Sequence, residues 1–164
     1  MRTPAAVLAS SIVFFGLACA PAEQAPPTAE PEMTQAESQE VFDALVEAWD
    51  VAQNANDVDA LMALYGAGAA AMPPEMPEAA GADAVRGLWA AFLESSQDND
   101  NVLQGFRVSG DLAVIWGTYT ATQAAEGEEG AVVAGKWMGI LERQADGSWK
   151  ALRNIWNTDS PTGS

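Results

Sequence analysis

The chain has 164 residues, with 23 acidic against 7 basic side chains, a formal net charge of −16, no histidine and one cysteine. Such a charge repels nucleic acid and anionic lipid, which argues against both as partners. Without histidine, Ser-His-Asp triads, Cys-His dyads and histidine-bound metals are excluded, and a lone cysteine excludes a disulfide within the chain. Any chemistry would therefore use Asp, Glu, Tyr, Lys, Arg or a borrowed cofactor. We expect no resident cofactor or metal.

Residues 1–18 predict a secretory signal peptide, because a short positive start precedes an apolar run too short to span a membrane. The run ends in Gly16-Leu17-Ala18-Cys19, which resembles a bacterial lipobox, in which the cysteine is acylated. Leu17 stands two places before Cys19, where lipoboxes usually have it three places before. The alternative is cleavage after Ala20, which Pro21 disfavours. We expect export to the cell envelope, with membrane attachment only through lipid on Cys19.

Residues 19–33 are rich in Pro, Ala and Glu and predict an extended tether, since they contain almost nothing to bury. A frayed N-terminus is the alternative interpretation. The folded domain is expected over residues 34–161, followed by a short tail at 162–164.

Three helices are expected at the start of this domain. The segment Thr34–Glu37 has the spacing of a capping box, and apolar residues at helical spacing continue to about Gln53. A short second helix carries residues 61–65 and ends at the glycines that follow, before a short strand at 69–72. The third helix spans about 82–95, and Gly87 in its middle indicates either close packing or a weak spot.

From Asn101 onward the pattern is typical of strands, at 102–108, at 112–123 and in a hairpin closed by Ala145-Asp146-Gly147. The expected register places Glu142 opposite Lys150, a pair of opposite charges that contributes only ~0.2–1 kcal/mol. Three helices followed by an antiparallel meander predict an α+β fold, with the helices on one side of a curved sheet.

Four segments of the chain resemble a known family. They are ALVEAWDVAQNANDVDALMALY, GADAVRGLWAAFLES, GDLAVIWGTYTAT and DGSWKALRNIWNTDSP. Together they resemble the SnoaL-like, ketosteroid-isomerase-like proteins of the nuclear transport factor 2-like superfamily, and most of all their uncharacterised bacterial branch. The resemblance covers residues 38–161. It implies a cone of three helices against a strongly bent sheet, with a pocket between them, and many members dimerise. Known activities include isomerisation, cyclisation and epoxide hydrolysis, while many members only bind or scaffold.

Two positions depart from that family. Relatives often carry an acidic residue where this chain has Gly68, and Arg-Asp where it has Arg153-Asn154. Asn exchanges no proton near neutral pH, so a general base at that position is lost. The resemblance therefore implies a domain from which the usual acid–base groups have been removed.

The candidate ligand-binding residues come from the hairpin and from aromatic positions elsewhere. In the expected register Lys136, Asn154 and Trp156 share one face, with Lys136 opposite Trp156. As a pocket, this face would bind an anionic group through Lys136 and pack a ring on Trp156; the alternative is an exposed or dimer-facing patch. The other candidates are aromatics that are equally typical of a core, namely Tyr65, Trp89 and Trp116.

Two functions remain open. The first is a cell-envelope module that binds a small apolar or weakly anionic ligand; the second is an isomerase- or cyclase-like enzyme using Tyr65, Lys136 or a carboxylate elsewhere. A buried carboxylate within hydrogen-bond reach of Tyr65 or Lys136 would favour the enzyme, and a pocket of apolar groups and amides would favour binding. Large side chains on both faces of the last hairpin also predict a homodimer through the outer face of the sheet.

Overall fold

The computed structural model describes residues 33–124 and 129–159, which all belong to one compact unit spanning residues 32–164. The expected signal peptide, Cys19, the tether up to residue 32 and the tail at 162–164 lie outside the described residues. Within the described ranges, no helix is both long enough and apolar enough to cross a membrane.

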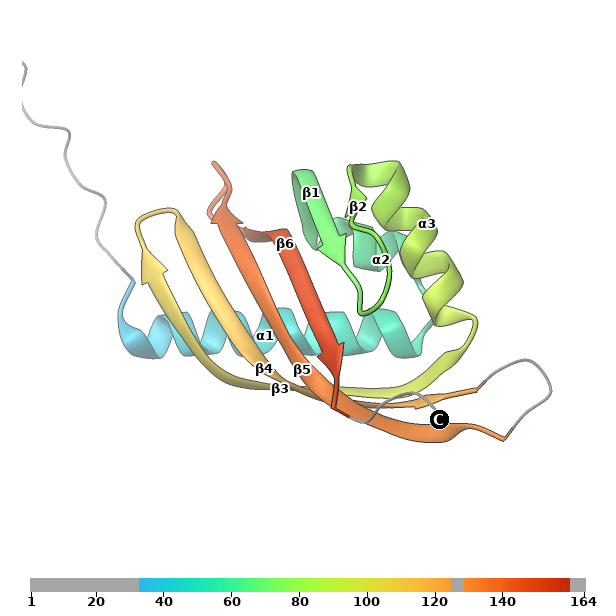
Figure 1. Ribbon diagram of the computed structural model, residues 1–164. Helices are drawn as coiled ribbons and strands as arrows, with labels where there is room; N and C mark the ends of the chain where they lie inside the picture. The colour runs from blue at the N-terminus through green and yellow to red at the C-terminus, as the bar shows by residue number, and fades with distance from the viewer. Residues whose placement is uncertain (1–32, 125–128, 160–164) are drawn as a thin grey trace, which may run out of the picture. The chain divides into compact units, whose positions relative to one another are not determined.

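Helix α1 (Gln35–Asn54) is the long first helix, and it runs across the strands of the sheet in Figure 1. The predicted capping box is confirmed: Thr34 Oγ1 accepts from the backbone N of Glu37 at 3.2 Å, and a Glu37 carboxylate oxygen accepts from the backbone N of Thr34 at 2.8 Å. The helix buries Phe42 completely, with the aromatic rings of Phe106 and Trp149 at 5.2 and 5.6 Å. Apolar spacing and capping therefore predict this helix from the local sequence, and the burial of Phe42 packs it on the sheet.

The second helix is shorter than predicted. Helix α2 (Val58–Ala63) is capped by Asp57, which accepts from the backbone N of Ala60 at 2.9 Å. It ends before Tyr65, which instead begins strand β1 (Tyr65–Met72), four residues earlier than the predicted strand. The reason is tertiary, because residues 65 and 70–72 pair with the last strand of the sheet. The small strand β2 (Ala79–Ala80) follows, and then helix α3 (Ala82–Leu93).

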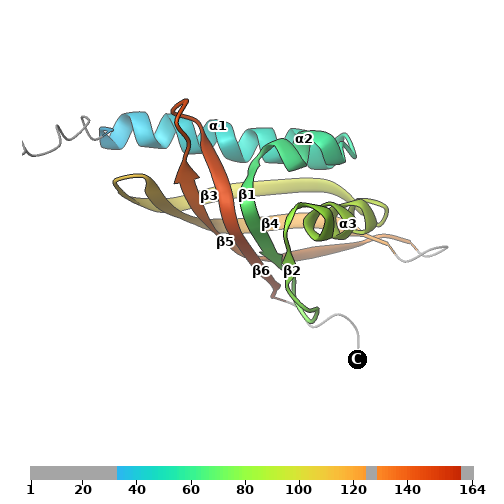
Figure 2. The ribbon, with the colours of Figure 1, turned by 90° about the horizontal axis from the view of Figure 1, so that it is seen from above.

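A six-stranded sheet in the order β2-β1-β6-β5-β4-β3 forms the other layer. The last four strands are β3 (Ser96–Ser109), β4 (Leu112–Gln123), β5 (Ala131–Arg143) and β6 (Trp149–Thr158). All neighbouring strands are antiparallel except β1 and β6, which are parallel. Seen from above in Figure 2, α1 lies along one face of this bent sheet. The expected α+β architecture is confirmed.

Strand β3 begins six residues before its predicted start at Val102. The missed part, Ser96–Asn101, is polar and lacks the alternation that identifies a strand. It also contains a register shift between Gln97 and Asp100, with Asp98 in a left-handed conformation (φ 51°). This bulge bends the strand, and Asn54 at the end of α1 holds it by accepting from the backbone N of Asn99 at 2.7 Å.

The last hairpin follows the predicted register near its turn and departs from it further on. Glu142 pairs with Lys150, as predicted. A bulge at Leu152 then leaves one residue of β6 without a partner, since Leu141 pairs with Ala151 but Ile140 pairs with Arg153. Every later residue of β6 is therefore shifted by one position relative to the prediction. Because side chains alternate between faces with a period of two, each of these residues lies on the face opposite to the predicted one.

This shift makes the predicted arrangement of the hairpin face wrong. Lys136 pairs with Asn157, and Trp156 pairs with Trp137 on the opposite, buried face. Asn154 pairs with Gly139 and lies on the same buried face as Trp156. The bulge thus separates Lys136 from both residues with which it was grouped.

Large side chains and glycines alternate across β4 and β5 on the face toward the helices. The pairs are Ile115 with Gly139, Gly117 with Trp137, and Tyr119 with Gly135. A Cβ at position 117 would lie 2.6 Å from the Trp137 ring, and one at position 135 would lie 2.5 Å from the Tyr119 ring. The two aromatic rings therefore lie against glycines of the neighbouring strand, where a larger side chain would not fit.

Candidate ligand-binding site

A cavity of about 60 Å³ lies between α1, α3 and the inner face of the sheet and opens to the surface. It is several times larger than the ~10–15 Å³ needed for one water molecule, so it has room for several waters or for part of a small organic molecule. Six aliphatic or small residues and six aromatic residues form most of its lining. The aromatic ones are Trp49, Trp89, Phe92, Tyr119, Trp137 and Trp156.

The aromatic side of the cavity is a packed cluster contributed by α1, α3 and β6. The rings of Trp89 and Trp156 stack with centroids 5.4 Å apart and planes 18° apart. Trp49 meets Trp89 edge to face at 6.0 Å, and Phe92 meets Trp156 in the same way at 6.0 Å. Offset-stacked and edge-to-face pairs stabilise beyond simple burial, so these rings form a wall of fixed shape.

The polar part of the lining consists of side-chain amides, together with the Tyr119 hydroxyl. Four amides contribute, and none of the lining residues in the described part of the chain is charged. The amides come from α1, from the polar start of β3 and from β6. They are Gln53, Asn99, Asn101 and Asn154.

One hydrogen-bond network connects α1 to β3 at the edge of the cavity. The carboxylate of Asp50 accepts from the backbone N of Asn101 at 3.1 and 3.2 Å, and also from the Asn101 side chain. The same Asn101 amino group donates to Gln53 Oε1 at 2.9 Å. Burial raises the pKa of Asp50, although the Asn101 hydrogen bonds oppose this shift and the nearby Asp100 charge adds to it. Asp50 thus lies behind Asn101 and holds it in place.

A second network runs under Asn154. Trp89 Nε1 donates to the Tyr65 hydroxyl oxygen at 2.8 Å, and the Tyr65 hydroxyl donates to Asn154 Oδ1 through a long bond of 3.5 Å. Burial raises the pKa of Tyr65, and the hydrogen bond from Trp89 lowers it by less. Tyr65 is therefore neutral at all physiological pH values. It supports the cavity lining from behind and is not part of it.

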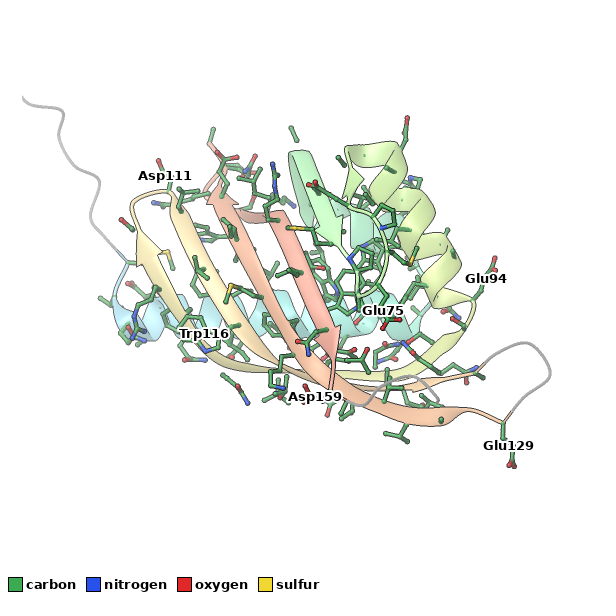
Figure 3. All side chains as sticks on the ribbon, viewed as in Figure 1. Glu75, Glu94, Asp111, Trp116, Glu129 and Asp159 are labelled. Atoms are coloured by element: carbon green, nitrogen blue, oxygen red, sulfur yellow. The ribbon has the colours of Figure 1, made fainter. Side chains whose placement is uncertain are left out.

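The structure brings four of the six predicted site residues together, namely Tyr65, Trp89, Asn154 and Trp156. Lys136 and Trp116 lie on the outer face of the sheet instead. Lys136 forms an ion pair with the exposed Asp159, and Trp116 lies against Arg107, whose guanidinium carbon is 5.8 Å from the ring centre. Trp116 and Asp159 are labelled in Figure 3. Whether the four inner residues bind a ligand stays a prediction.

Several lining residues were missed by sequence reasoning, and only some left a usable signal. Gln53 lies four residues after Trp49 and seven after Val46, so helical spacing alone places it on the buried face of α1. Asn99 and Asn101 lie in the polar part of β3, where no alternation reveals which face they occupy. Their contribution depends on the bulge, which no local pattern predicted.

The surroundings of the two predicted proton donors decide what chemistry the site contains. Tyr65 is bonded to Trp89 and Asn154, and Lys136 pairs with an exposed carboxylate on the outer face. Neither has a buried carboxylate within hydrogen-bond reach among the described residues. In the same residues no cluster of His, Cys, Asp or Glu has the geometry of a metal site. The cavity itself offers apolar walls and amides.

Three helices against a strongly bent six-stranded sheet, with a cavity between the layers, define the cone-shaped nuclear transport factor 2-like fold. The family model described as the SnoaL-like domain matches residues 43–152, and the chain belongs to this family. The resemblance seen in the sequence is thereby confirmed at the level of the superfamily. Among curated proteins, none matches the chain.

Solved structures share the fold over most of their length. A ketosteroid isomerase-like protein from Erwinia carotovora atroseptica is 26% identical with a TM-score of 0.68, covering 76% of this chain and 98% of its own. A proposed dehydratase of the NTF2-like family from Streptomyces avermitilis is 16% identical with a TM-score of 0.64, covering 76% and 98%. An uncharacterised protein with a cystatin-like fold from Caulobacter vibrioides is 14% identical with a TM-score of 0.65, covering 76% and 92%. The last two likenesses show the fold alone.

Proposed function

We propose that this domain binds a small, neutral and mainly apolar molecule between α1 and the sheet, without acid–base turnover. The observation that carries the proposal is the composition of the cavity lining, which is aromatic, aliphatic and amide and contains no charged side chain among the described residues. Binding sites for small molecules are typically apolar cavities with a few polar groups that fix orientation. Here the four amides supply those polar groups.

A neutral ligand fits better than an anionic one. The anionic group was expected to meet Lys136, which lies on the outer face and pairs with Asp159. An ion buried without a partner costs several kcal/mol, and the net charge of −16 adds a repulsive field. The weakly anionic ligand is therefore dropped from the proposal.

An enzyme of the isomerase or dehydratase type is the alternative, since such names describe two of the similar structures. Its best candidate for a proton acceptor is Asp50, whose pKa is raised by burial. However, both oxygens of Asp50 accept from Asn101, and Asp50 does not line the cavity. A turnover that Asp50→Asn abolishes, while the fold is kept, would move the assignment to an enzyme.

The protein is further proposed to act in the cell envelope, attached through lipid on Cys19. This rests on the apolar run that ends at the lone cysteine and on the tether that follows it. The several chains of a bacterial lipoprotein hold firmly where a single chain does not. Cys19→Ser is expected to move the protein from the membrane fraction to the soluble fraction. Unchanged fractionation and unchanged intact mass would refute the anchor.

Native mass spectrometry of protein purified from its own host tests the binding function. We expect an adduct of small-molecule mass that denaturation removes. Gly139→Leu provides the blocked variant, because Gly139 lines the cavity and a Cβ there meets Ile115 at an acceptable 3.4 Å. Met138→Leu, the neighbouring residue on the outer face, is the control. An adduct that survives Gly139→Leu in a folded protein would place the ligand elsewhere.

A further inference from the structure

We infer that Gln53 and Asn154 orient the ligand as hydrogen-bond donors, so that the cavity selects neutral molecules bearing acceptor oxygens, such as carbonyl groups. This inference deepens the proposed function and rests on it. Its basis is the orientation of the two side-chain amides, which the surrounding hydrogen bonds determine. A side-chain amide has one oxygen that accepts and one amino group that donates, and its neighbours determine which end is left for a ligand.

The orientation of Gln53 follows from Asp50. An ionised carboxylate only accepts, so the Asn101 amide must turn its amino group toward Asp50. That same amino group donates to the oxygen of Gln53 at 2.9 Å. The amino group of Gln53 consequently points elsewhere, and it donates to no described residue. Because Gln53 is 5% exposed and lines the cavity, its amino group is a donor held at the cavity wall.

The orientation of Asn154 follows from Trp89. An indole N–H only donates, so the Tyr65 oxygen accepts from Trp89 at 2.8 Å and the Tyr65 proton remains available. The Asn154 oxygen, 3.5 Å away, accepts that proton. The amino group of Asn154 donates to no described residue. Two separate networks, beginning at a carboxylate and at an indole, thus leave the same kind of group free.

The other polar side chains of the lining already have hydrogen-bond partners, apart from the oxygen of Asn101. Asn99 accepts from Ser96 at 2.9 Å and donates to Asn54 at 3.4 Å, and the Tyr119 hydroxyl is bonded to Thr158 at 3.4 Å. The oxygen of Asn101 is the acceptor that remains beside the two donors. With two free donors and no cation among the described residues of the lining, a ligand gains from uncharged acceptors, whereas a carboxylate loses its hydration without gaining an ion pair.

The experiment compares three probes of similar size: acetophenone, which has one carbonyl acceptor, ethylbenzene, which has none, and benzoate, which is anionic. Titrations of the purified protein are followed by the indole N–H signals in ¹H–¹⁵N NMR, since four tryptophans line the cavity. The quantity of interest is the affinity for acetophenone relative to ethylbenzene. We expect benzoate to bind most weakly.

Gln53→Glu and Asn154→Asp replace each free donor by an acceptor while keeping the oxygen that the protein uses. Each is expected to lower the relative affinity for acetophenone about fivefold, the effect of one net hydrogen bond. Gln53→Met and Asn154→Leu test the same loss without a buried charge, in case the charged variants do not fold. Matched controls are Gln39→Glu on the exposed face of α1 and Asn157→Asp on the outer face of β6. These controls are expected to leave the ratio unchanged.

The outcomes separate the inference from the function beneath it. If ethylbenzene and acetophenone bind and no variant at position 53 or 154 alters their ratio, the donor assignment is wrong and the binding function stands. If benzoate binds better than acetophenone, selection for neutral acceptors is wrong. If none of the probes shifts an indole signal up to its solubility limit, the binding function fails as well.

Discussion

The two faces of β4, β5 and β6 share one backbone and differ in burial and charge. On the inner face, residues such as Ile115, Trp137 and Leu141 are buried and no charge reaches the cavity lining in the described residues. On the outer face, Lys136 pairs with an exposed acid, and Leu112 and Met138 remain 49% and 45% exposed. Because successive residues of a strand alternate between faces, an odd or even position along the strand decides whether a side chain lies on the inner or the outer face. The single bulge at Leu152 changes that parity for Asn154 and Trp156.

The largest expected effect on stability comes from filling the space at Gly117 on the inner face. Gly117→Ala would place a Cβ 1.9 Å from the carbonyl oxygen of Val102 and 2.6 Å from the Trp137 ring. A backbone carbonyl cannot move away as a flexible side chain can. We expect a loss of about 3 kcal/mol or more in the free energy of unfolding, measured by urea denaturation.

The same substitution away from the inner face has the opposite expected sign. Gly87 lies in α3, and nothing lies within 4 Å of the position that its Cβ would take. Gly87 is therefore a weak spot and not a point of close packing. Gly87→Ala is expected to stabilise by about 0.5–1 kcal/mol, because alanine loses less backbone entropy in a helix. Equal effects of the two substitutions would contradict the role given to Gly117.

The sequence predicted the outline of this comparison and missed its decisive detail. Capping at Thr34, apolar spacing in α1 and the Glu142–Lys150 pair are local signals, and the structure confirms them. The bulge at Leu152 depends on strand pairing across the sheet, so no local sequence pattern predicts it. For this reason Trp156 lines the cavity, while Lys136, with which it was grouped, does not.

The polar start of β3 was missed for a different reason. It is held by side chains of α1 more than 40 positions earlier, through Asn54 and Asp50, and not by an alternating apolar pattern. Its amides belong to the cavity only because that contact is made. Long-range polar contacts of this kind leave no periodic signal in a sequence.

The outer face provides a further prediction, a homodimer. Met138 and Ile155 are cross-strand neighbours and are 45% and 46% exposed, beside Leu112 and Ile140. Exposed apolar clusters of this kind mark interaction surfaces. We expect a dimer mass by light scattering at tens of micromolar and a monomer after combining Met138→Lys with Ile155→Lys. Val51→Lys, at an exposed position on α1, is the control that keeps the dimer. A monomeric parent protein at that concentration would refute the proposal.

A smaller effect distinguishes two buried tryptophans. Trp137 Nε1 donates to the carbonyl of Thr118 at 2.9 Å, whereas Trp149 Nε1 is buried and has no partner among the described residues. An unpaired buried N–H costs about 1–3 kcal/mol, so replacing it with a carbon offsets part of the lost packing. We expect Trp149→Phe to destabilise by about 1–3 kcal/mol less than Trp137→Phe in urea denaturation. A larger loss for Trp149→Phe would indicate that its N–H has a partner after all.

The smallest expected effect is at Lys136, on the outer face. Its ion pair with Asp159 is exposed, and exposed pairs contribute little because water and salt screen them. Hydrogen bonding to Lys136 lowers the pKa of Asp159 below its ordinary value. A carboxyl group whose pKa is lowered on folding stabilises above its unfolded pKa, and this contribution disappears as the pH falls through the folded pKa. Lys136→Ala is therefore expected to reduce stability slightly at pH 7, with the difference from the parent vanishing under acid conditions.

Acetophenone binding should not change, since Lys136 does not line the cavity. Weakened binding in this variant would return Lys136 to the site and undo the separation of the two faces.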